Sequence, residues 1–333
     1  MVSTLPYELL KIIFDECAND SVTLYSCILV NKNWCVLGLP YLWAKPFTLL
    51  LSNLKFGKIQ RIENLITTFI ECFADIDSLE NALQTCKQNR KKFPFDYNRY
   101  LKEIHFHEIH SLVILTRFNT INMPAVTMII HLAIVYCPNL TTLSLTNHAL
   151  HHLAFYINDK WTLPSLQNLS LPLNLHYGAF CTLSRAAHKL ESISVDGPGV
   201  YCPAEIEGLA KLIQSQHQLT AITIKLVAEI NMSSLFKLLE SQSNTLESIV
   251  LKESHLCQDN LKIEQMTFHQ LTTIYITRSW VSERGLKAII KADLPKLQQL
   301  KFEDTGLHNN ESDWFLLRNK YPNQLVHSGE YFY

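Results

Sequence analysis

The sequence predicts an α/β protein in which a small helical module precedes an α/β solenoid. Three short apolar-rich helical segments fall within residues 1–47, and a less regular helical stretch covers residues 48–98. From residue 99 to residue 333 a short strand pattern recurs about eight times, with helical segments between its occurrences. Strands joined by helical crossovers pair in parallel, so we expect a parallel sheet on the concave side of the solenoid.

The first predicted helix begins at Leu5 and Pro6 and continues past Phe14. Pro6 suits the first helical turn, and Glu8 lies where a negative charge stabilises the N-terminal end. At 3.6 residues per turn the apolar residues form two stripes, a wider apolar surface than one small helix buries against its own neighbours. Leu9, Ile13 and Cys17 form one stripe, and Leu10 and Phe14 form the other.

Two further short helices are predicted before residue 47. Residues 23–30 are apolar almost throughout, and the segments around Trp34 and Trp43 follow at short intervals. A module this small buries little surface by itself, and an exposed apolar patch usually marks an interface. The segment is therefore predicted to be a docking module.

The spacing of these residues resembles an F-box, particularly the F-boxes of large fungal families. The match covers residues 3–47 and rests on Leu5-Pro6-x-Glu8-Leu9-Leu10-x-x-Ile13-Phe14, Val30-Asn31-Lys32-x-Trp34 and Leu42-Trp43. The resemblance implies binding to the Skp adaptor, which bridges to a cullin scaffold, a RING subunit and a ubiquitin-conjugating enzyme. By the same resemblance the adaptor-binding residues are Leu5, Pro6, Leu9, Ile13, Val30 and Trp34. Asn31 departs from the family pattern, because many F-boxes have a cysteine there.

The segment from residue 48 to residue 98 is predicted to be a helical linker. Apolar residues recur at helical spacing from Ile59 to Phe69 and again from Leu79 to Cys86. The basic run from Lys87 to Lys92 is open to two interpretations, a nuclear import signal or a solvated loop.

The repeat region is defined by the pattern Leu-x-x-[Leu/Ile]-x-apolar. Successive starts lie 24 to 29 residues apart, except for a first interval of 39. In a strand, alternate residues point to one face, so pairs such as Leu169 and Leu171 are predicted to point inward. Helices are expected at 124–136, 204–214, 234–239 and 283–291. The pattern begins at Leu101, Leu140, Leu166, Leu190, Leu219, Leu246, Leu271 and Leu297.

These repeats resemble the leucine-rich repeats of roughly 26 residues that are common in F-box proteins. The resemblance covers residues 99 to about 325 and is carried by Cys137-Pro-Asn-Leu140, Leu163-Pro-Ser-Leu166 and Leu294-Pro-Lys-Leu297. It implies a protein substrate on the concave sheet. The turn position that often holds Asn or Cys in the family is occupied here by His148, Asn174, Pro198, Val227, Ser254, Ser279 and Thr305, so variable turn geometry is expected.

The period-two rule identifies the candidate substrate-binding residues on the outward side of the strands. These are Lys225, Lys252, Tyr275 and Lys301, with Arg278 at their flank. Lys225 and Lys252 either hold one acidic or phosphorylated group between them or are two solvated lysines that keep the sheet soluble. One outward column is expected to contain Ser144, Ser170, Ser194 and Thr223, and the next Asp196, Lys225, Lys252 and Thr277.

Composition argues against several other classes of protein. The chain has 29 Lys+Arg and 30 Asp+Glu, so we expect neither a nucleic-acid partner nor a polyanion partner. The longest apolar stretch, residues 126–137, is too short for a membrane span and is predicted to be a buried helix. The nine cysteines are scattered without a Cys-x-x-Cys spacing, which is typical of reduced, mostly buried thiols in the cytoplasm or nucleus.

No catalytic, cofactor-binding or metal-binding motif is found in the sequence. His105, His107 and His110 span a predicted strand and turn without the His-Glu-x-x-His spacing, so surface histidines are expected rather than a metal site. His148, His151 and His152 are interpreted in the same way. With nine glycines the chain also lacks a Gly-rich phosphate loop. Acidic residues such as Glu8 and Asp15 near the start argue against a secretory signal.

Together these observations predict a non-enzymatic protein that resembles the substrate-recognition subunits of SCF-type ubiquitin ligases, located in the cytoplasm, the nucleus or both. The alternative is a leucine-rich-repeat interaction scaffold that recruits no ligase. Binding of the Skp adaptor separates the two.

Overall fold

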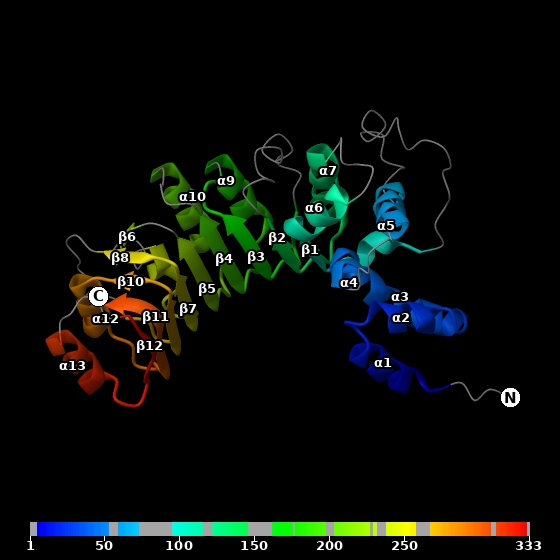
Figure 1. Cartoon of the computed structure of the whole chain (residues 1–333). Coiled ribbons are helices and arrows are strands. Elements are labelled where there is room, and N and C mark those ends of the chain that lie inside the picture. Colours follow the sequence, from blue (N-terminus) through cyan, green and yellow to red (C-terminus); the bar gives the residue numbers. More distant parts are fainter. Residues whose placement is uncertain are drawn as a thin grey trace. The chain divides into compact units, whose positions relative to one another are not determined.

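The computed structural model of the chain comprises two compact units, residues 1–165 and 166–333 (Figure 1). It describes residues 5–52, 59–72, 95–115, 122–145, 162–175, 177–197, 203–226, 229–231, 238–257, 267–307 and 311–331. Five predictions fall largely or wholly outside these residues: the linker helix at 79–86, the basic run at 87–92, the helix at 234–239, the turn positions Pro198 and Val227, and the environment of His148, His151 and His152.

The three predicted N-terminal helices are present in the first unit. They are α1 (Tyr7–Glu16), α2 (Ser21–Ile28) and α3 (Lys32–Ala44). The Asp20 side chain caps α2 by accepting hydrogen bonds from the backbone N–H groups of Val22 and Thr23. The Asn31 side chain caps α3 by accepting one from Trp34 N at 3.0 Å. Asn31, which departs from the F-box pattern, is therefore a helix cap in this chain.

These helices close around a small aromatic core. Phe14 and Leu24 are fully buried, and the Phe14 ring lies edge-on to Trp34 and stacked on Tyr41. A side chain at Gly38 would place its Cβ 2.5 Å from the Phe14 ring, so the close approach of α3 to α1 requires glycine at this position.

The rest of the first unit is mainly helical. The predicted buried helix is α7, and a short parallel strand pair joins Ile104 of β1 to Leu143 of β2 in register. The turn predicted after His105 is wrong, because Phe106 begins α6. Phe106, Ile109 and Leu112 are buried at helical spacing, and this packing favours a helix over a turn. The remaining elements are α4 (Pro46–Ser52), α5 (Ile59–Glu71), η2 (Tyr97–Arg99), β1 (Glu103–His105), α6 (Phe106–Ile114), α7 (Asn122–Tyr136) and β2 (Thr142–Ser144).

The second unit is built on parallel strands, as predicted. Each strand begins two residues after the leading leucine of its repeat, and neighbours pair in the order β3-β4-β5-β7-β9-β11. A further strand, β12 (Leu325–Tyr331), pairs with β11 in parallel. The main strands are β3 (Asn168–Pro172), β4 (Ser192–Gly197), β5 (Ala221–Leu226), β7 (Ser248–Lys252), β9 (Thr273–Thr277) and β11 (Gln299–Leu307).

Two ladders of inward side chains run across these strands and form the core. None of these residues is more than 3% exposed, so the predicted strand register is confirmed. Alternation in a strand then places the intervening residues on the opposite face. One ladder contains Leu169, Ile193, Ile222, Ile249, Ile274 and Leu300, and the other contains Leu171, Val195, Ile224, Leu251, Ile276 and Phe302.

Helices between the strands cover the inward ladders. Figure 1 shows α9 and α10 side by side, both on the same side of β3, β4 and β5. The predicted helices at 204–214 and 283–291 are present as α10 and α12. The helices are α9 (Tyr177–Ala186), α10 (Pro203–Gln214), η4 (Glu240–Gln242), α12 (Glu283–Lys291) and α13 (Glu311–Lys320).

Two buried glutamines link successive repeats behind the sheet. The Gln216 amide accepts a hydrogen bond from Leu190 N and donates to the carbonyls of Ala187 and Leu212. The Gln242 amide donates in turn to the carbonyls of Ile213 and Gln216. These side chains satisfy backbone groups that the turns leave buried.

A second set of short parallel strands follows the main strands, and the sequence did not predict it. Its members have two or three residues each, too few for an alternation pattern to be detected. Trp280 of β10 pairs with His255 of β8 on one side and with Gly306 of β11 on the other. The set comprises β6 (Glu229–Asn231), β8 (His255–Cys257), β10 (Trp280–Val281) and the C-terminal part of β11.

The same turn joins the main and the short strands in three successive repeats. Glu253, Arg278 and Asp304 have positive φ angles of 53°, 48° and 49°, and each precedes a buried hydroxyl residue. Those residues are Ser254, Ser279 and Thr305, so the turn geometry, which was expected to vary, is the same in these three repeats. The Ser279 hydroxyl donates to Thr277 O and accepts from Ser254 N, so it links one turn to the next.

No single helix in the described part of the chain is long and apolar enough to cross a membrane, although α3 and α4, bent by 82°, pass the length and composition criteria as a pair.

Candidate functional site

The N-terminal helices expose an unusually large share of apolar side chains. Sixteen large apolar side chains are exposed among the described residues, and nine of them lie between residues 5 and 36. We call these nine the N-terminal apolar surface. They are Leu5, Tyr7, Leu9, Ile12, Val22, Tyr25, Leu29, Val30 and Val36.

Helix geometry explains why these residues remain outside the core. In α1 the core takes Leu10 and Phe14, whereas Leu9 and Ile12, three residues apart, lie on a separate exposed side. Leu5 is also exposed and lies just before the helix begins. In α2 the core takes Leu24. The same spacing rule aligns Val22, Tyr25 and Leu29, whose exposed fractions are 62%, 58% and 67%.

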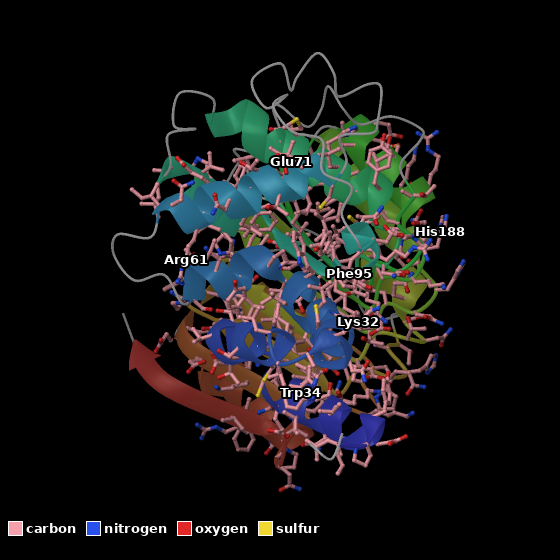
Figure 2. All side chains as sticks on the ribbon, turned by 90° about the vertical axis from the view of Figure 1, so that its right-hand side faces the viewer. Lys32, Trp34, Arg61, Glu71, Phe95 and His188 are labelled. Atoms are coloured by element: carbon pink, nitrogen blue, oxygen red, sulfur yellow. The ribbon has the colours of Figure 1, made fainter. Side chains whose placement is uncertain are left out.

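The six residues predicted to bind the adaptor divide into two groups. Leu5, Pro6, Leu9 and Val30 are exposed, and three of them belong to the N-terminal apolar surface. Ile13 and Trp34 are half-buried, and the Trp34 ring packs against Phe14 with ring centroids 5.9 Å apart. In Figure 2 Trp34 is labelled on the N-terminal helices, which face the viewer.

The α2 part of this surface was not singled out by sequence reasoning. Val22 directly precedes the apolar segment 23–30, and Tyr25 and Leu29 lie within it, so apolar residues occur on the buried and the exposed sides of the helix alike. Their spacing of three and four residues was the available signal.

Trp43, which belongs to the last part of the F-box resemblance, is buried and stacks obliquely on Tyr97 with ring centroids 4.5 Å apart. Tyr41 donates a hydrogen bond of 2.7 Å to the Asp15 carboxylate. Desolvation, together with that carboxylate, raises the pKa of Tyr41 to about 12, so the phenol stays a neutral donor that ties α3 to α1.

The second candidate site is the face of the second unit's sheet that carries the outward side chains, which we call the open face. Its residues lie in columns fixed by the strand register. One column contains Ser170, Ser194, Thr223, Val250, Tyr275 and Lys301, and the next contains Asp196, Lys225, Lys252, Thr277 and Glu303. All four predicted substrate-binding residues therefore lie on this face. Ser144 belongs to the first unit, where it pairs with His105.

Ion pairs connect the charged residues of the open face. Lys225 Nζ lies 3.8 Å from Asp196 Oδ2 and 3.4 Å from Glu253 Oε2. The other Glu253 oxygen lies 3.2 Å from Arg278 Nη1. Because Lys225 already has two carboxylate partners, Lys225 and Lys252 do not form an isolated cationic pair.

Tyr275 and Lys301 form the neighbouring part of the face. The Lys301 ammonium lies 4.7 Å from the Tyr275 ring centroid, within cation–π range, and 3.3 Å from Glu303 Oε2. The aromatic ring is thus held in place by a side chain from the next strand.

The histidines near residue 105 lie close together. The ring centroids of His105 and His107 are 6.1 Å apart, and His105 Nε2 lies 3.9 Å from Glu103 Oε2. His105 is half-buried rather than on the surface. Its interaction with the Glu103 carboxylate raises the pKa of His105 and lowers that of Glu103. Within the described ranges no group of three or more His, Cys, Asp or Glu side chains is arranged to hold a metal ion.

Six cysteines with described side chains are free thiols, of which Cys137 is buried and the others are partly buried. Burial raises the pKa values of Cys72 and Cys137 to about 12, so both remain protonated at neutral pH. Cys86 and Cys202 lie outside the described residues.

A scan of protein-family models finds no match to this chain, and a search of curated proteins finds none either.

Proposed function

We propose that this protein is the substrate-recognition subunit of an SCF-type ubiquitin ligase. In this proposal the N-terminal apolar surface binds the Skp adaptor, and the open face binds a protein substrate. The chain itself catalyses no step, since the other subunits of such a ligase carry out ubiquitin transfer.

The observation that carries the proposal is the concentration of exposed apolar side chains on α1 and α2 outside a core that is already closed. Complete burial of one Val, Leu or Ile side chain contributes about 1.5–3 kcal/mol. Partial burial of several such side chains is enough to support a specific complex, and a contiguous apolar patch on a soluble protein usually marks an interface.

The order and spacing of the apolar residues support the identity of the partner. Leu5, Leu9 and Val30 combine exposure with the positions at which the F-box resemblance places adaptor contacts. Asn31, the one residue that differs from the F-box pattern, caps α3, so this difference is compatible with the helical arrangement.

The regular columns of the open face support the role in substrate binding. Parallel strands display side chains there at fixed spacing, and small, aromatic and charged residues are interspersed along them. A face of this kind provides several contacts to one extended segment of a partner.

Reconstitution tests the proposal. The full chain is co-expressed with a Skp adaptor, a cullin and a RING subunit, and a tag on the chain is used to purify the complex. We expect the native chain to retain all three subunits. Leu9→Asp combined with Val30→Asp should lose them, because a carboxylate in a desolvated contact is strongly unfavourable.

The matched control is Ile206→Asp, which introduces the same carboxylate at an exposed isoleucine on α10. It should retain the complex. If the native chain recruits no adaptor, the proposal is wrong and a scaffold that recruits no ligase becomes the better description.

A further inference from the structure

The open face contains one cation that its carboxylates leave unneutralised. Lys252 lies between Lys225 and Thr277 in register, and its side chain is half-buried. Among the described residues no ion pair to Lys252 is found within 4 Å, whereas Lys225 and Arg278 both contact carboxylates. Among the described residues of this network, Lys252 is thus the cation that has no ion-pair partner.

The balance of charge around Lys252 restricts what can bind there. Three cations, Lys225, Lys252 and Arg278, face two carboxylates, Asp196 and Glu253. The nearby Lys301 and Glu303 pair with each other and cancel, so one positive charge remains. A carboxylate, with one negative charge, completes this balance. A phosphoryl group carries about −1.5 to −2 charges at neutral pH and would exceed it, next to Glu253.

The side chains beside Lys252 define the rest of the contact. Val250 lies two residues earlier on β7 and is only partly buried, and its neighbour in register is Tyr275. Residues two apart in an extended segment are separated by about 6.6 Å, which is the same spacing as Val250 and Lys252 on their own strand. An extended segment along the strand direction therefore places an apolar side chain on Val250 and Tyr275 and an acidic side chain on Lys252.

We infer that the open face binds an extended peptide segment whose unmodified aspartate or glutamate pairs with Lys252 and whose neighbouring apolar side chain packs on Val250 and Tyr275. This inference rests on the proposed function, since it names the class of substrate that the open face takes. On the sequence alone, a group bound at Lys225 and Lys252 is expected to be either acidic or phosphorylated. The structure favours the carboxylate of an unmodified acidic residue.

An array of short random peptides tests the inference with the full chain. Each peptide is synthesised in three versions that differ at one central position, which is glutamate, phosphoserine or serine. The native chain should bind the glutamate versions at least about tenfold more tightly than the serine versions, the size expected of a hydrogen bond to a charged group. It should bind the phosphoserine versions no more tightly than the glutamate versions.

Three variants assign the preference to this site. Lys252→Ala should abolish the preference for glutamate, whereas Lys189→Ala should keep it, because Lys189 is an exposed lysine after α9. Glu253→Gln removes one carboxylate from the network and should move the preference toward phosphoserine. Melting curves of all three variants establish that each is folded.

The inference is overturned if the native chain shows no glutamate preference, if it prefers phosphoserine, or if Lys252→Ala retains the native profile. Adaptor binding, measured on the same preparations, distinguishes this failure from failure of the proposed function. A chain that binds the adaptor without any preference for acidic peptides refutes only the inference. A chain that binds no adaptor refutes the proposed function.

Discussion

Replacement of Ile222 by alanine is expected to destabilise the second unit by about 4 kcal/mol. Ile222 is fully buried and lies in register between Ile193 and Ile249. The change removes three carbon atoms, which at about 0.8 kcal/mol each amount to about 2.4 kcal/mol of lost burial. The cavity that remains adds to this, and measured Leu or Ile to Ala changes range from about 2 to 5 kcal/mol.

Thermal unfolding followed by circular dichroism measures the effect. For a unit of this size a loss of 1 kcal/mol lowers the melting temperature by about 2–4 °C, so the transition should fall by roughly 8–16 °C. The control is Thr223→Ala, which changes the next residue on β5 but points to the open face. Its melting temperature should remain near the native value. Equal effects at the two positions would refute the assignment of inward and outward faces.

Three further predictions concern local interactions. Gln216→Ala should destabilise the second unit by about 2 kcal/mol or more in urea titrations, because it leaves the buried backbone groups Leu190 N and Ala187 O without a partner at about 1–3 kcal/mol each, whereas Leu212 O keeps its hydrogen bond from the Ser215 hydroxyl. A loss below about 1 kcal/mol would contradict this. Asn31→Ala should cost about 1 kcal/mol by removing the cap on Trp34 N, and Asn31→Asp should restore most of it. The pH dependence of melting should show the pair of His105 and Glu103. Because the pKa of His105 is raised in the folded state, its ion pair contributes stability fully below pH 6.5, and this stability is lost as pH rises through the folded pKa. Because the pKa of Glu103 is lowered in the folded state, its carboxylate contributes stability above pH 4.5, and this stability is lost as pH falls through the folded pKa. Melting temperatures should therefore decline from pH 6 to pH 8 less steeply in Glu103→Gln than in the native chain, and identical slopes would contradict the pairing.

The main strands were predictable because burial alone determines them. Residues such as Ile193 and Val195 alternate with polar neighbours, and a buried face at period two leaves only one register. The start of α6 was predicted to be a turn after a strand because His105 and His107 alternate with apolar residues, as in a strand. The burial of Phe106, Ile109 and Leu112 at helical spacing favours a helix instead.

The repeated turn and the glutamine links were beyond sequence reasoning for a different reason. The positive φ at Glu253 occurs in a residue that rarely adopts that conformation, and burial of Gln216 contradicts its usual preference for the surface. Both depend on contacts with neighbouring repeats.

The candidate sites were predictable in position but not in detail. The outward columns follow from strand alternation, so Lys225, Lys252, Tyr275 and Lys301 were placed on one face. The ion pairs of Lys225 were not foreseen, because the Glu253 carboxylate reaches it from a turn whose conformation the sequence does not reveal. The exposed stripe on α2 was missed because apolar residues occur on both the buried and the exposed sides of that helix.

The affinity of the full chain for a purified Skp adaptor tests the central claim most directly, and isothermal titration calorimetry measures it. We predict nanomolar to micromolar binding with a negative heat-capacity change, as expected for burial of apolar surface. Leu9→Asp combined with Val30→Asp should abolish this binding, and Ile206→Asp should leave it unchanged. Failure of the native chain to bind, or equal binding by the double variant, would contradict the assignment of the N-terminal apolar surface as the adaptor site.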